Sequence, residues 1–441
     1  MDPGNYRPVS ILNVLSKILE RTVHGQLVGY LEKKGILFDY QSGFRSGFST
    51  DTCLINLSDH ERSEISKGNF VGMVMIDLRK AFDTVDFDIL LSKLKGMGVG
   101  NIDWYRSYLT GRRQCVTVNG IESSFLDMEC GVPQGSILGP ILFLCYINDM
   151  SASLNCRLSL YADDSTLIAS GKSVETLSVY LSSQLESCSK WLVDNKLSLH
   201  VDKCESIIFG SKRKIKECAN FTVTCFGTPV RRVSNVKYLG VMLDENLSGE
   251  THASSILKKV ASRMSFLYRN SCFLDIQSKR TLCGALVQPI LDYCCSSWYS
   301  GLNANLKQRL DVLQRKMIRY VYGMDFRAHI NSSHFREIGW LMMEDRVRYF
   351  KLVHAFKIHK GLAPQYVCEF FTRSSSIHSY NTRGSQTNYF VSRDDTKASY
   401  MIDSFVYTAK RDWNCLPPRL KQITSLDDFK SKSRAFLFES Y

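Results

Sequence analysis

The sequence predicts an α+β fold whose C-terminal half is mainly helical. Up to about residue 250, short apolar runs of strand length alternate with helical periods, whereas beyond it strand signals become rare. The 441 residues are 44% apolar and 22% charged, which is enough to bury sizeable cores and excludes a disordered chain.

Strands are expected where apolar residues run for about four to eight positions between turn residues. Five segments fit: residues 70–76, 157–161, 166–169, 206–209 and 236–243. The second and third are joined through Asp163 and Asp164, so we expect a hairpin with acidic residues at its tip.

Helices are expected where apolar side chains recur every three to four residues. One follows Pro8, and another begins at Thr50 or Asp51, either of which can cap it. Residues 306–321 carry an apolar stripe with lysine and arginine on the other faces, which indicates a basic amphipathic helix. The polar residues 373–400 predict a connector dominated by loops.

Composition excludes several classes of protein. The longest apolar stretch, residues 137–147, is too short and too interrupted by proline to span a bilayer. The fifteen cysteines lack the paired spacing of a zinc site or a disulfide framework, so we expect reduced thiols in an intracellular protein.

The net charge of +13 is concentrated in the C-terminal part of the chain. Residues 1–250 carry 27 basic and 28 acidic side chains, whereas residues 251–441 carry 29 and 15. A surplus of lysine and arginine favours a polyanionic partner such as nucleic acid, because binding releases condensed counterions. A solvated basic surface is the alternative that charge alone leaves open.

Three aspartates stand where a sheet edge could bring them together. Asp77 directly follows the apolar run 70–76, and Asp163 and Asp164 lie at the tip of the expected hairpin. Mg²⁺ prefers such oxygen ligands, usually one or two carboxylates with substrate phosphates and water. Taken singly, Asp77 is better explained as the cap of a helix starting at Leu78, and the aspartate pair as an ordinary turn.

Seven motifs follow one another over about 240 residues: NYRPVSILNVLSKILERTV (5–23), QSGFRSGFST (41–50), MIDLRKAFDTVD (75–86), GVPQGSILGPILF (131–143), YADD (161–164), LHVDKCESIIFG (199–210) and KYLGVMLD (237–244). Together they resemble the reverse transcriptases of non-LTR retrotransposons, of the jockey-like LINE type. The resemblance implies a right-hand polymerase fold, with fingers and palm at 1–250, a helical thumb at 251–325 and a basic helical extension at 326–441.

The resemblance also implies a catalytic centre. Asp77 and Asp163 would hold two Mg²⁺ ions, or Mn²⁺, with Asp164 as the third carboxylate. The backbone carbonyl of Leu78 would add a ligand. Lys203 would lie near the leaving pyrophosphate as a general acid or a fixed charge, although an exposed lysine without a role is the alternative.

Nucleotide and template contacts are implied in the same way. Phe82 would exclude the 2′-hydroxyl of a ribonucleotide, unless it is an ordinary buried phenylalanine. Arg45 would donate to the incoming triphosphate, unless it is a surface arginine of a loop. Gln134 and Gly135 would let the backbone approach the nascent base pair, or would form a tight turn before a buried helix. The template and primer would be held by four basic residues: Lys307, Arg315, Lys316 and Arg319.

The activity implied is RNA-directed DNA synthesis from a primer 3′-hydroxyl. The partners would be an RNA template, a DNA primer or target and dNTPs, in the cytoplasm and nucleus and away from membranes. The motifs begin at Asn5, so we expect a fragment that lacks the start of the fingers, with the endonuclease separate or missing. Phe87 and His200 stand where relatives often have histidine and asparagine.

Three rival functions stay open at this point. One is a decayed or repurposed element that binds nucleic acid without catalysis, against which the intact aspartates argue. Another is an RNA-templated RNA polymerase, which shares the palm but would not need Phe82. A third is an intron-encoded maturase, for which the sequence names no RNA partner.

Overall fold

The computed structural model describes residues 10–372, 389–391, 400–439 and 441. The chain forms two compact units. Unit 1 comprises residues 1–46, 72–206 and 220–232, and unit 2 comprises residues 47–71, 207–219 and 233–441. The predicted division at residues 250 and 325 follows different boundaries and stays a prediction. Residues 5–9 of the first motif and nearly all of the expected connector at 373–400 lie outside the described residues.

Most of a mixed five-stranded sheet lies in unit 1, and this sheet confirms the α+β class. Its strand order is β11-β8-β1-β7-β6. The strands span Arg231–Arg232, Glu205–Phe209, Phe70–Ile76, Asp164–Gly171 and Arg157–Tyr161 in that order. β1 is apolar and almost wholly buried, as a central strand requires.

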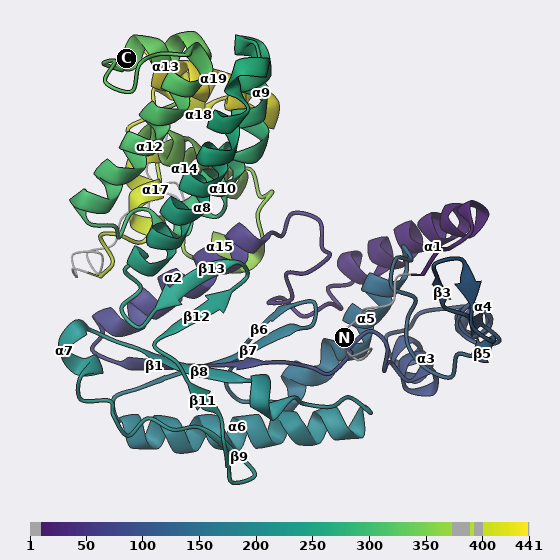
Figure 1. Cartoon of the computed structure of the whole chain (residues 1–441). Helices are drawn as coiled ribbons and strands as arrows, with labels where there is room; N and C mark the ends of the chain where they lie inside the picture. The colour runs from purple at the N-terminus through teal and green to yellow at the C-terminus, as the bar shows by residue number, and fades with distance from the viewer. Residues whose placement is uncertain (1–9, 373–388, 392–399, 440) are drawn as a thin grey trace. The chain divides into compact units, whose positions relative to one another are not determined.

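Helices cover this sheet and extend beyond it. The longest, α6 (Val174–Asp194), runs along one face of the sheet (Figure 1) and has buried positions at the spacing of an amphipathic helix. The other helices of unit 1 are α1 (Val14–Lys33), α3 (Phe87–Gly96), α4 (Ile102–Leu109) and α5 (Gly139–Ile147). The apolar stretch that was too short for a membrane is α5, which is buried in this unit.

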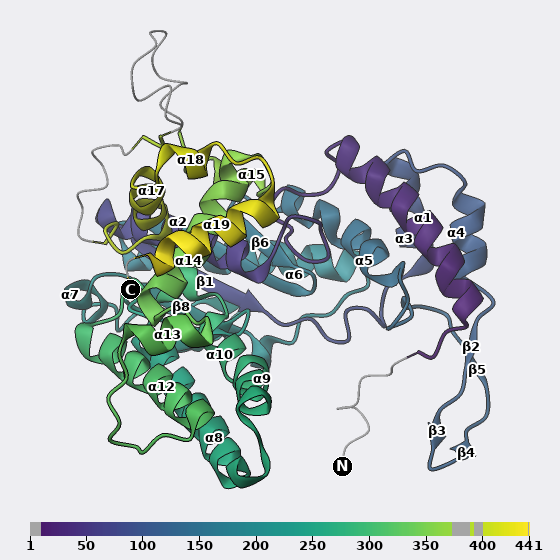
Figure 2. The same cartoon turned by 90° about the horizontal axis from the view of Figure 1, so that it is seen from above.

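Three short antiparallel pairs complete unit 1. The strands β2 (Arg113–Gln114) and β5 (Leu126–Asp127) continue into β3 (Thr117–Val118) and β4 (Ile121–Glu122), making one long ribbon (Figure 2). Asn119 and Gly120 both have positive φ at its tip, as a tight hairpin turn requires. The third pair joins β9 (Thr224–Cys225) and β10 (Thr228–Pro229).

Unit 2 is mainly helical, as its sequence predicts. Its helices are α2 (Thr50–Ser66), α7 (Lys212–Ile215), α8 (Glu250–Arg269), α9 (Ile276–Leu286), α10 (Gln288–Asp292), α11 (Cys295–Trp298), α12 (Ala304–Tyr322), α13 (Ser332–Ile338), α14 (Met343–His359), α15 (Gln365–Cys368), α17 (Phe405–Asn414), α18 (Pro418–Lys421) and α19 (Leu426–Phe438). The expected amphipathic helix is α12, which buries its apolar stripe.

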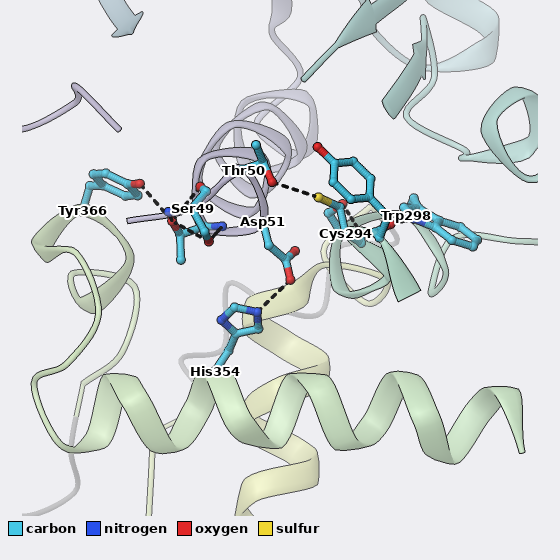
Figure 3. Close-up of polar contacts among 10 residues, drawn as sticks. Ser49, Thr50, Asp51, Cys294, Trp298, His354 and Tyr366 are labelled. Atoms are coloured by element: carbon cyan, nitrogen blue, oxygen red, sulfur yellow. Dashed lines mark hydrogen bonds and ion pairs between the residues drawn. The ribbon is translucent and has the colours of Figure 1, made fainter. Parts of the chain in front are cut away.

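The helix expected at Thr50 or Asp51 is α2, but its cap is Ser49. The Ser49 hydroxyl accepts the Thr52 N–H at 3.1 Å and the Thr52 hydroxyl accepts the Ser49 N–H, a reciprocal capping arrangement. The first turn is then tied to the rest of unit 2 (Figure 3). Tyr366 bonds Thr52 at 3.2 Å, and His354 Nε2 lies 2.7 Å from Asp51 Oδ2.

One local prediction was wrong, and one alternative is excluded. Residues 236–243 are a hairpin of β12 (Asn235–Tyr238) and β13 (Val241–Asp244), because Leu239 and Gly240 both adopt positive φ and reverse the chain. No helix starts at Leu78 either. The next helix along is α3, which Asp86 caps by accepting the Ile89 N–H at 2.9 Å.

All fifteen cysteines are free of disulfide bonds. Among the helices of the described residues, none combines the length and the apolarity needed to cross a bilayer.

Candidate active site

One cavity of unit 1 gathers most of the residues that the sequence singles out. Its volume is about 830 Å³, and it lies among the turn after β1, the β6–β7 turn, the loop before α5 and the segment before β8. Seven predicted site residues line it: Asp77, Leu78, Phe82, Gln134, Gly135, Asp163 and Lys203. Asp164 and Arg45 do not line it.

The backbone beyond β1 is held by the segment before β8. The His200 N–H donates to the Asp77 carbonyl at 2.9 Å, and the Arg79 N–H donates to the Ser198 carbonyl at 3.0 Å. These two bonds flank Leu78, which sits in an isolated antiparallel bridge. In such a pair the flanked residue turns its own N–H and carbonyl away from the partner segment. The Leu78 carbonyl is therefore directed away from the bonds that fix its neighbours.

Asp163 occupies the turn of the β6–β7 hairpin. Tyr161 faces Asp164 in the antiparallel register, so Ala162 and Asp163 are the two turn residues. Ala162 has φ of 55°, an uncommon conformation for a residue other than glycine. Asp164 is the first residue of β7, with an exposed side chain. The structure thus brings Asp77 and Asp163 to one cavity and leaves Asp164 outside its lining.

Phe82 is half-buried in the cavity wall. Its ring stacks on buried Phe143 of α5, with centroids 4.3 Å apart, and meets Phe44 edge-on at 6.5 Å. Nearby, the Gln134 amide donates to Asp83 Oδ1 at 2.9 Å. A Cβ on Gly131 would come within 2.7 Å of the Asp83 carbonyl, so only glycine lets these two loops meet.

Four basic side chains line the cavity, and a role was expected from the sequence for only one of them. Lys203 is the one it named, and Arg79, Lys80 and His200 join it. Arg79 and Lys80 are exposed and follow Asp77 closely in the chain, which is the signal that could have found them.

Cys204 follows Lys203 in the chain. Burial raises the pKa of its thiol to about 11, so the thiol stays protonated near neutral pH.

Arg45 is engaged elsewhere in unit 1. Its guanidinium pairs with both Glu32 oxygens, at 2.9 and 2.8 Å, and donates to the carbonyls of Phe38 and Gln41. Its side chain is only 8% exposed. A triphosphate would have to displace Glu32 to reach this fork, so the assignment of Arg45 stays a prediction.

The four basic residues expected to hold template and primer lie on α12 of unit 2. Arg315 and Lys316 are exposed. Lys307 donates to the Ser300 carbonyl at 3.3 Å, and the Arg319 Nε donates to the Ala328 carbonyl at 2.8 Å. Arg315 and Lys316 are therefore the two whose charged groups are most open to a polyanion.

Three aspartates line the cavity, and Asp77 and Asp163 are the two that could hold a divalent cation, since Asp83 accepts a hydrogen bond from Gln134. Neither the Asp77 nor the Asp163 carboxylate forms a hydrogen bond or ion pair within the described part of the chain. Those residues also contain no cluster of three or more acidic, histidine or cysteine side chains arranged to hold a metal. Two unpaired carboxylates still fit Mg²⁺, because that ion takes one or two from the protein and the rest of its oxygens from phosphate and water.

Residues 1–243 match the model of the reverse transcriptase (RNA-dependent DNA polymerase) family. Because this match covers more than half of the chain, the protein belongs to that family. The family generally uses divalent metal ions.

Its curated relatives come from mobile elements. The chain is 28% identical over 363 residues to a probable RNA-directed DNA polymerase from transposon BS of Drosophila melanogaster, covering 78% of this chain and 39% of the relative. It is also 28% identical over 335 residues to the RNA-directed DNA polymerase from mobile element jockey of Drosophila funebris, covering 73% and 36%. The chain therefore spans less than half the length of these relatives.

Solved structures add only a weak likeness. A telomerase from Candida tropicalis, in complex with a fragment of telomeric RNA, is 14% identical with a TM-score of 0.39, over 70% of this chain and 51% of that one. A likeness at this level supports no further conclusion about the chain.

Proposed function

We propose that the chain is an RNA-directed DNA polymerase of a non-LTR retrotransposon, which adds dNTPs to a primer 3′-hydroxyl. The observation that carries the proposal is that Asp77 and Asp163 line one cavity, with both carboxylates unpaired among the described residues. Family membership supports the same activity.

Asp77, Asp163 and the Leu78 carbonyl would hold two Mg²⁺ ions, or Mn²⁺. Such ions supply electrostatic stabilisation of the attacking and leaving oxygens in an in-line phosphoryl transfer. Asp164, being outside the cavity lining, would support the hairpin rather than an ion.

The other cavity residues would select and orient the nucleotide. Phe82 would press against the sugar and exclude a 2′-hydroxyl, since the stack on Phe143 prevents its ring from retreating. Arg79, Lys80 and Lys203 would neutralise the triphosphate and the departing pyrophosphate. In this proposal these three cations, rather than Arg45, would contact the triphosphate.

The wider partners belong to the same proposal. An RNA template and a DNA primer would contact the basic C-terminal half, through Arg315 and Lys316 of α12. The nick that primes synthesis would come from an endonuclease, and the work would take place in the cytoplasm and nucleus.

Primer extension tests the proposal. An RNA template with an annealed DNA primer, dNTPs and Mg²⁺ should give extension by the native chain and none by Asp163→Ala. Asp194→Ala, an exposed carboxylate at the end of α6, is the matched control and should extend normally. Extension that persists in Asp163→Ala, or its absence in the native chain, would overturn the assignment.

Nucleotide preference separates the nearest rival. A reverse transcriptase should incorporate dNTPs and reject rNTPs on the same primer, whereas an RNA polymerase should do the reverse. The unpaired carboxylates in a shared cavity favour catalysis over a decayed remnant.

A further inference from the structure

The loop that begins with Gln41 and Gly43 touches the hairpin turn carrying Asp163. The segment runs beside β6 like a short extra strand. Leu160 N–H donates to the Tyr40 carbonyl at 3.0 Å, and Ser42 N–H donates to the Leu160 carbonyl at 2.8 Å. Arg45 is the residue of this loop to which the sequence alone points, and it lies beyond Gln41 and Gly43 in the chain.

The Gln41 side chain bonds the turn itself. Its Oε1 accepts the Ala162 N–H at 3.0 Å and the Gly43 N–H at 2.9 Å. Both partners are donors, so the amide oxygen, and not the nitrogen, must face them. Gln41 is 2% exposed, which removes water as a substitute acceptor for these two N–H groups.

The turn needs outside support because its first residue is strained. Ala162 has φ of 55°, and its N–H is the group that Gln41 binds. A non-glycine residue in this conformation persists when its surroundings hold it there. Asp163 comes next, so the direction of its carboxylate follows from the conformation of Ala162.

Gly43 makes the approach sterically possible. A Cβ at this position would lie 2.4 Å from the Ala162 nitrogen and 3.1 Å from its Cα. Those are backbone atoms of the turn, which cannot rotate away as a side chain can. The loop and the turn are therefore fitted to each other by one hydrogen-bond acceptor and one missing side chain.

We infer that Gln41 is a positioning residue for catalysis: through Ala162 it fixes the turn that aims Asp163 into the cavity, and Gly43 permits that contact. The inference rests on the proposed function for its catalytic consequence. The contact between loop and turn is a separate claim, which can be measured without any turnover.

The test compares Gln41→Met with Gln184→Met. Met keeps the length of the side chain and removes the acceptor. Gln184 is the matched control, because it is a buried glutamine of unit 1 whose Oε1 accepts the Asn155 N–H at 2.8 Å and which does not line the cavity. Gln41→Glu keeps an acceptor oxygen at the same reach and is the rescue variant.

Hydrogen exchange of the Ala162 amide is the readout that needs no activity. Exchange should rise about tenfold or more in Gln41→Met and stay as in the native chain in Gln184→Met and Gln41→Glu. In primer extension, kcat should fall about tenfold to a hundredfold in Gln41→Met, while KM for dNTP changes less than about twofold. Unchanged Ala162 exchange in Gln41→Met, or equal losses of kcat in both Met variants, would overturn the inference.

Gly43→Ala provides a second, independent variant should Gln41→Met not fold. It should also raise Ala162 exchange and lower kcat, whereas Gly100→Ala, where a Cβ meets nothing within 4 Å, should do neither. If the native chain extends no primer while Gln41→Met still raises hydrogen exchange of the Ala162 amide, the polymerase proposal fails and the contact between loop and turn is supported. Normal exchange and normal kcat in Gly43→Ala would contradict the fit of loop to turn.

Discussion

The Glu20 carboxylate accepts the Ile137 N–H at 2.7 Å, joining α1 to the loop before α5 across 117 positions of the chain. Its Oε2 also lies 3.4 Å from the Leu138 nitrogen, and the side chain is 1% exposed. Glu20 thus acts as a remote cap for the segment that carries Gln134 and Gly135 into the cavity.

Removing that cap should destabilise unit 1. Glu20→Ala leaves buried N–H groups without an acceptor, so the free energy of unfolding should fall by about 1–3 kcal/mol in urea titrations. Glu20→Gln keeps one acceptor oxygen and should lose less. Glu122→Ala, on an exposed strand of the ribbon, is the control. Equal stability of Glu20→Ala and the control would show that the cap contributes nothing.

A substitution of Arg45 distinguishes between a structural role and binding of the triphosphate. Arg45→Lys loses the two-pronged contact with Glu32, so the free energy of unfolding should fall by about 1.5–3 kcal/mol. The KM for dNTP should stay within about twofold, because other cations face the cavity. Glu32→Gln should shift stability in the same direction. A raised KM with unchanged stability would instead assign Arg45 to the triphosphate.

Phe82 should set the preference for deoxynucleotides. In Phe82→Val the smaller side chain leaves room for a 2′-hydroxyl, so the ratio of kcat/KM for dNTP over rNTP should fall about tenfold or more. Single-nucleotide incorporation on an RNA template measures this ratio. Phe125→Val, on the exposed ribbon, is the control and should leave it unchanged. If Phe82→Val keeps the native ratio of kcat/KM for dNTP over rNTP, Phe82 does not select the sugar.

Lys351 should make unit 2 more stable as the pH rises. Burial lowers the pKa of Lys351 from its ordinary 10.5 to about 8, while its ammonium donates to Thr408 Oγ1 at 2.8 Å. Between about pH 8 and 10.5 the unfolded chain binds the extra proton, so the free energy of unfolding contributed by this group increases with pH. The free energy of unfolding of the native chain minus that of Lys351→Met, measured in urea, should therefore rise from about pH 8 to pH 10.5. A flat or falling difference would contradict a depressed pKa.

The sequence singled out two aspartates that the structure places in the wall of one cavity. Asp77 follows an apolar run and Asp163 lies between two runs of strand length, so both positions could be deduced from local patterns. Contacts between residues far apart in the sequence could not be deduced from local patterns. No local pattern indicates that Arg45 pairs with Glu32, and the bond from the Ala162 N–H to Gln41 joins residues 121 positions apart.

Two local errors have a common cause in backbone conformation. Leu239 and Gly240 reverse the chain where a mainly apolar run predicts one strand, since non-glycine residues seldom adopt positive φ. The cap of α2 lies one or two residues before the predicted Thr50 or Asp51, because Ser49, Thr50 and Asp51 are all good capping residues and only geometry decides among them.

The central claim is that Asp77 and Asp163 share one divalent cation site, and cleavage by bound Fe²⁺ tests it most directly. Fe²⁺ with ascorbate and peroxide generates radicals that cut the backbone close to a bound ion. The native chain should be cut near both Asp77 and Asp163, Mg²⁺ should compete with the cutting, and Asp163→Asn should lose both cuts while Asp194→Asn keeps them. Cutting at only one of the two aspartates, or cutting that survives in Asp163→Asn, would contradict a shared site.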